Sequence, residues 1–90
     1  MISIRDAAKR ALDFYKEIYP STSGELIEEV ELDESKQYWL ITLSFLGTVS
    51  DNTMSPLSAV LQPKYERNYK IFKVNANSGN VESMKIRQLV

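Results

Sequence analysis

The chain has 90 residues, of which 43% are hydrophobic and 26% charged, and its net charge at pH 7 is −1. This length suits one domain, and the composition is that of a folded protein rather than a disordered one. A net charge so close to zero removes the usual electrostatic attraction to nucleic acid or to an anionic membrane surface. We therefore expect neither nucleic acid nor membrane among its partners.

Two residue types are missing, since the sequence contains neither cysteine nor histidine. Without cysteine there is no disulfide, no thiolate nucleophile and no cysteine-containing zinc site. Without histidine the commonest general base and the usual imidazole metal ligand are also gone. The three glycines are isolated, so no glycine-rich phosphate loop is formed. We expect no enzyme, no metal and no cofactor, and an enzyme with unassigned residues ranks third among the functions considered.

The expected location is the cytoplasm. Charged residues interrupt the opening MISIRDAAKRAL before a signal-peptide core could form. The longest uncharged stretch, residues 37–50, is shorter than the roughly 20 apolar residues of a membrane-spanning helix.

An amphipathic helix is predicted near the N-terminus. Its apolar residues recur at helical spacing: Ile4, Ala7, Ala8, Ala11, Leu12, Tyr15, Ile18 and Tyr19. Ser3 followed by Asp6 resembles a capping box, and Pro20 disfavours helical geometry at Tyr19. The predicted helix therefore runs from Ile4 to Ile18.

Four strands are predicted after the helix, over residues 25–32, 37–45, 65–76 and 81–88. In the second, alternation places one set of side chains on one face, namely Trp39, Ile41, Leu43 and Phe45. The opposite face carries Tyr38, Leu40, Thr42 and Ser44. The face with Trp39 is the predicted docking surface for the helix.

The other strands are assigned to faces in the same way. In the first, Leu26, Val30 and Leu32 are predicted to share one side, opposite Ile27, Glu29 and Glu31. In the third, Phe72 and Val74 share one face, opposite Tyr65, Tyr69 and Ile71. Residues 77–80 read as a turn, in which Gly79 supplies a positive φ.

These elements predict an α+β domain spanning residues 1–90, with the N-terminal helix packed on one face of a four-stranded antiparallel meander. The second and third strands are separated by a long connection, residues 46–64, that is unusually apolar for a loop. One helix covers one face only, so we expect something else to cover the face with Tyr38 and Leu40.

The final hairpin carries a resemblance to known families. The residues Tyr69, Ile71, Phe72, Val74, Asn75, Ala76, Ser78, Gly79 and Val81 follow the pattern Y-x-V-x-V-D-A-x-T-G-E-V. This pattern resembles the PepSY-like, cystatin-like group of small α+β domains, and the layout is similar to that of small bacterial toxin-immunity proteins. Asn75 replaces the usual Asp, Asn80 replaces the usual Glu, and there is one extra residue between Ile71 and Val74. The resemblance implies a binding, inhibitory or immunity role and transfers no catalytic residue.

Two charge patterns have alternative interpretations. The acidic run in residues 25–34 could hold a metal, but it alternates with apolar residues where a calcium loop needs a tight turn, so a solvated strand edge is favoured. Residues 64–73 interleave Lys and Arg with Tyr and Phe, as a single-stranded nucleic-acid platform does. Alternation splits those residues between two faces, which argues against such a platform.

The leading functional hypothesis is a non-catalytic protein-interaction module of inhibitor or immunity type. Its predicted contact combines the 46–64 connection with the adjacent sheet face, namely Val49, Met54, Leu57, Val60, Leu61, Tyr38, Leu40, Tyr65 and Tyr69. The connection either folds over the uncovered sheet face or is presented to a partner. The alternative function is a structural accessory protein that binds only a second copy of itself, as a homodimer.

Overall fold

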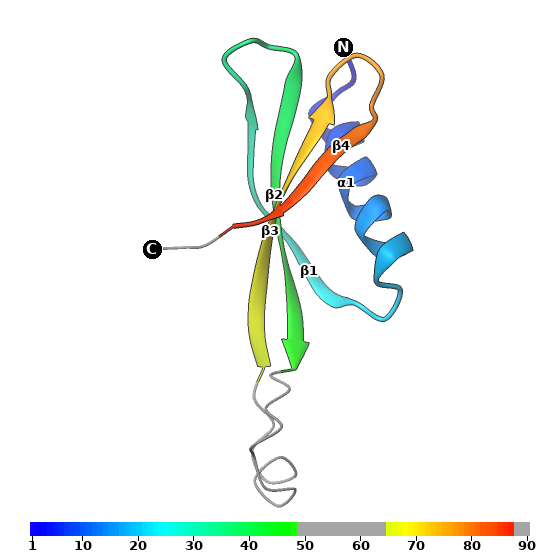
Figure 1. Ribbon diagram of the computed structural model, residues 1–90, viewed down its shortest axis with the longest axis vertical. Coiled ribbons are helices and arrows are strands. Elements are labelled where there is room, and N and C mark those ends of the chain that lie inside the picture. The colour runs from blue at the N-terminus through cyan, green and yellow to red at the C-terminus, as the bar shows by residue number, and fades with distance from the viewer. Residues whose placement is uncertain (49–64, 88–90) are drawn as a thin grey trace, which may run out of the picture.

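The computed structural model describes residues 1–48 and 65–87 and places one helix against one four-stranded sheet (Figure 1). Helix α1 spans Ile4–Ile18, as predicted. The side chain of Ser3 caps it by accepting a hydrogen bond from the Asp6 backbone N–H at 3.1 Å, which satisfies one of the free amide groups of the first turn. The helix ends before Pro20, where helical geometry is disfavoured.

The sheet is an antiparallel meander in the order β1-β2-β3-β4. Its strands are β1 (Ser23–Leu32), β2 (Tyr38–Thr48), β3 (Tyr65–Asn75) and β4 (Val81–Ile86). The predicted fold class is therefore confirmed. Several boundaries differ from the prediction: β1 begins at Ser23, two residues earlier, and β4 ends at Ile86, two residues earlier. The largest difference is in β2, which continues to Thr48 and pairs with β3 there, so the first three residues of the predicted 46–64 connection belong to the sheet.

The turns agree with the sequence pattern. The β3–β4 turn contains Gly79 with φ 78°, in the left-handed region that favours glycine. The end of the Arg10 side chain packs over this glycine. This contact connects the last hairpin to α1.

The core lies between α1 and the sheet face that carries Trp39, as predicted. Its fully or nearly buried members are Ala7, Ala8, Ala11, Tyr15, Ile41, Leu43, Phe45, Phe72 and Val74. Small alanines on the inner side of the helix leave room for aromatic rings: Tyr15 stacks on Phe45 with 3.6 Å between ring centroids. The indole N–H of Trp39 donates to the carbonyl oxygen of Ile2 at 3.2 Å, which holds the start of the chain against the sheet.

One predicted assignment of side chains to faces is wrong. Leu26 is paired with Ser44, so it lies on the face away from the helix, whereas Ile27 is paired with Leu43 on the helix face. The cause is a register shift between Ile27 and Glu29, where one strand gains a residue relative to its neighbour. Strict alternation cannot anticipate such a bulge. Val30 and Leu32 keep their predicted side, because they follow the shift.

Candidate functional site

The sheet face opposite α1, called the open face below, carries most of the predicted contact residues that the structure describes. Two rows of side chains cross it from β1 to β4. The first row is Glu29, Thr42, Ile71 and Lys85, and the second is Glu31, Leu40, Lys73 and Ser83. Acidic residues stand at the β1 end of both rows, whereas Lys85 stands at the β4 end of the first. The middle of the face is partly apolar.

The predicted contact residues are only partly brought together. Tyr38, Leu40 and Tyr69 share the open face, as expected, and each is half-buried rather than exposed. Tyr65, the first residue of β3, pairs with Thr48 of β2. The remaining members lie outside the described residues: Val49, Met54, Leu57, Val60 and Leu61.

An arginine crosses this face from one edge strand to the other. Arg87 follows β4, and its backbone N–H donates to the Tyr69 carbonyl oxygen at 2.9 Å. Its guanidinium binds the Glu29 carboxylate through two hydrogen bonds, Nη1 to Oε2 at 2.7 Å and Nη2 to Oε1 at 3.2 Å. Nη1 also donates to the Thr42 hydroxyl at 2.8 Å. The Arg87 side chain therefore passes over β3 and connects β4 to β2 and β1.

The ion pair between Arg87 and Glu29 shifts the pKa values of both groups. The hydrogen bonds from Arg87 hold the pKa of the Glu29 carboxyl below its ordinary value, and the same contact raises the pKa of Arg87. A carboxyl with a depressed pKa in the folded state stabilises the fold above its unfolded pKa. That contribution is lost as the pH falls through the folded pKa.

We expect the carboxyl carbon of Glu29 to titrate at a lower pH than those of glutamates without such a partner. In Arg87→Gln its midpoint should return to the ordinary glutamate range, because the two charge-assisted hydrogen bonds are gone. Carbon-detected NMR titration of both proteins measures this directly. An unchanged Glu29 midpoint in the variant would mean that the pair does not form in solution.

A second polar network lies beside the first. The hydroxyl of Ser44, which is 0% exposed, donates to Oε1 of Glu28 at 2.8 Å and accepts from Nε of Arg67 at 3.0 Å. Nη2 of Arg67 donates in turn to the backbone oxygen of Gly24. Glu28 reaches Ser44 because it sits at the register shift in β1. Thr42, 2% exposed, and Ser44 are thus sheltered by the chain's own long side chains.

The same kind of shelter continues along the face. The ammonium group of Lys73 lies 4.2 Å from the centre of the Tyr38 ring, a cation–π contact. Long side chains of the domain itself therefore cover part of this face, for which the sequence predicts a cover. Among the described residues, this face also contains a hollow of about 440 Å³.

Opposite charges stand on the two sides of this hollow. Leu40, Thr42 and Ile71 lie at its centre, Glu29 and Glu31 on the β1 side, and Lys85 and Ile86 on the β4 side, while Arg87 crosses from the end of β4 to Glu29. Such a mixture of apolar centre and charged rim is typical of protein contact surfaces. Among the described residues, no group of three or more carboxylates is arranged to hold a metal ion.

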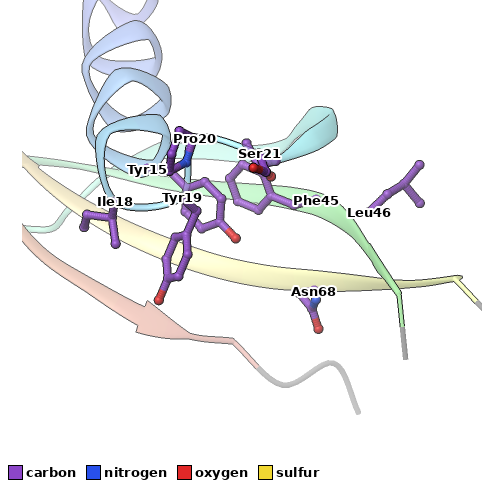
Figure 2. A pocket seen from close by; sticks show the side chains of 9 residues that line it. Tyr15, Ile18, Tyr19, Pro20, Ser21, Phe45, Leu46 and Asn68 are labelled. Atoms are coloured by element: carbon purple, nitrogen blue, oxygen red, sulfur yellow. The ribbon is translucent and has the colours of Figure 1, made fainter. Parts of the chain in front are cut away.

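A second hollow, of about 360 Å³, lies where α1 ends (Figure 2). The stacked rings of Tyr15 and Phe45 form part of its wall, and Ile18 and Tyr19 contribute exposed apolar surface. Burial raises the pKa of the Tyr15 phenol, against the opposing effect of its hydrogen bond with Thr22. Among the described residues, those that line this hollow are uncharged.

Sequence reasoning missed the polar networks of the open face, formed by Glu28, Glu29, Thr42, Ser44, Arg67 and Arg87. Alternation did place Arg67 on the face of Tyr69. The crossing of Arg87 depends on the exact pairing of three strands, which no local pattern reveals.

In the described part of the chain, no helix is long and apolar enough to cross a membrane. The resemblance to PepSY-like, cystatin-like and immunity proteins stays a prediction. No family model, no curated protein and no solved structure matches this chain.

Proposed function

We propose that this chain is a non-catalytic protein-binding domain of inhibitor or immunity type, which acts by covering a surface of another protein with its open face. The observation that carries the proposal is the hollow on that face, with Leu40 and Ile71 at its centre and charges of opposite sign on its two sides. A partly apolar centre inside a polar rim is the usual anatomy of a protein contact.

Preorganisation also supports the proposal. The two hydrogen bonds from Arg87 to Glu29 and the contact of Lys73 with Tyr38 hold these long side chains in place before any partner arrives. A surface whose side chains are already ordered loses less conformational entropy on binding. The 46–64 connection stays a sequence-based prediction as a further part of the contact.

The test compares two tyrosine truncations. Tyr69→Ala removes an aromatic group of the open face, whereas Tyr19→Ala removes an exposed tyrosine from the end of α1 and serves as the matched control. We expect Tyr69→Ala to lower capture of a stoichiometric protein partner from the native host by about tenfold or more, as loss of an interface hot spot does. Tyr19→Ala should leave capture unchanged.

Capture is measured by affinity purification with quantitative mass spectrometry, and folding of each variant by circular dichroism. Equal capture by wild type and a folded Tyr69→Ala would contradict the proposed surface. Loss of capture in Tyr19→Ala alone would move the contact to the hollow at the end of α1.

A further inference from the structure

Two charged residues of the open face, Glu31 and Lys85, lie at opposite edges. Glu31 lies on β1 and Lys85 on β4, whereas Glu29 on β1 is bound by the guanidinium of Arg87, which crosses the face from the end of β4. Glu31 and Lys85 are both exposed, and both line the same hollow from opposite sides. Neither forms an ion pair with another of the described residues. Their charges therefore face solvent across a half-buried apolar centre.

This division makes the face complementary to itself. Two sheets that pack face to face keep their strands roughly aligned. When the two-fold axis lies in the sheet plane and runs parallel to the strands, β1 of one copy lies over β4 of the other. When the axis instead runs across the strands, β1 lies over β1 and like charges meet. Only the first arrangement places Glu31 of each copy over the row that ends at Ser83 of the other, two residues along β4 from Lys85.

We infer that the open face binds a second copy of this chain, in a two-fold dimer whose β1 and β4 edges carry the complementary charges. The inference rests on one part of the proposed function, namely that the open face is a contact surface, and it assigns a second copy of this chain, in place of a different protein, as the occupant. Like charges set against each other suppress the alternative register, so Glu31 and Lys85 determine the orientation of the two copies.

The size of the face matches the lower end of specific interfaces. Strands β2 and β3 have eleven residues, β1 ten and β4 six, so at about 3.3 Å per residue and about 4.8 Å between strands the projected area is about 600 Å². Two copies would together bury about 1,200 Å², the lower limit of a standard interface. An isologous dimer buries the same patch on both copies, so Leu40 and Ile71 of each copy are covered together.

A pair of charge reversals tests the inference. Glu31→Lys and Lys85→Glu each place two like-charged pairs across the dimer, so each variant alone should dimerise about tenfold or more weakly than the wild type. An equimolar mixture of the two variants restores two opposite-charge pairs and should form a heterodimer. The double variant should recover the homodimer. Analytical ultracentrifugation reports the mass relative to the 10.3 kDa monomer.

Asp13→Lys is the matched control, because Asp13 is an exposed carboxylate on α1 and lies away from the sheet. It should leave dimerisation unchanged. Circular dichroism checks that each variant folds, as expected for exposed positions. Where a reversal unfolds the domain, the neutral variants Glu31→Gln and Lys85→Gln replace it. Each alone should weaken the dimer, and their mixture should recover part of the loss, because the heterodimer keeps one Glu31–Lys85 pair.

The outcomes separate the two proposals. A wild-type chain that stays monomeric overturns the inference, and the proposed function then survives only if Tyr69→Ala still lowers capture of another protein. A dimer that ignores both reversals uses another surface and also overturns the inference. A dimer that is lost in each variant and restored in their mixture supports it.

Discussion

Replacing Phe72 with alanine is expected to lower the free energy of unfolding by about 3–5 kcal/mol, the usual cost of removing a fully buried aromatic ring. Phe72 is 0% exposed and lies on β3 directly opposite Ile41. The rings of Phe14 and Tyr15 meet it edge to face, with centroids 6.4 and 6.3 Å away. One alanine would therefore leave a cavity at the point where the helix and the sheet are held together.

A domain of this size has a total stability of about 5–15 kcal/mol, so the variant should be close to its unfolding transition in water. Urea unfolding followed by circular dichroism measures the loss. Phe72→Leu keeps most of the volume and should cost much less. If Phe72→Ala lost no more stability than Phe72→Leu, the ring could not be packed between α1 and β3 as described.

Sequence reasoning succeeded where a local pattern decides the structure. The apolar residues of α1 repeat at helical spacing and Ser3 caps the helix, so its limits follow from short-range chemistry. In β2, alternation alone separates Ile41, Leu43 and Phe45 from the residues of the open face, because this central strand pairs with both neighbours. Among the described residues, α1 alone packs on a face of the sheet, and the face that it covers is the one with Ile41, Leu43 and Phe45.

The rest depends on pairing between distant segments. The register shift after Ile27 changes the side on which Leu26 lies, and nothing in the local sequence distinguishes it from a regular strand. Arg87 reads as an ordinary surface charge at the end of the chain, yet it reaches Glu29, 58 residues away. The sequence therefore predicts that the helix leaves the open face uncovered. It does not predict that Arg67 and Arg87 lie over part of that face.

Replacing Ser44 with alanine tests that shelter, and we expect it to lower the free energy of unfolding by about 1–3 kcal/mol. Ser44 is fully buried, and its hydroxyl is both donor to Glu28 and acceptor from Arg67. Alanine removes both hydrogen bonds at once and leaves two charged side chains without this partner. Because Glu28 lies on the edge strand β1, the loss should also increase amide hydrogen exchange in β1 more than in β3.

Ser83→Ala is the control, since Ser83 lies on the same face but is partly exposed, and it should change stability by less than about 0.5 kcal/mol. A double-mutant cycle between Ser44→Ala and Arg67→Leu isolates the coupling between the two side chains. A coupling near zero would mean that Arg67 covers the face through its apolar stem alone. A coupling close to the full effect of Ser44→Ala would show that the hydroxyl holds the guanidinium in place, and that the polar network keeps the open face ordered before any partner binds.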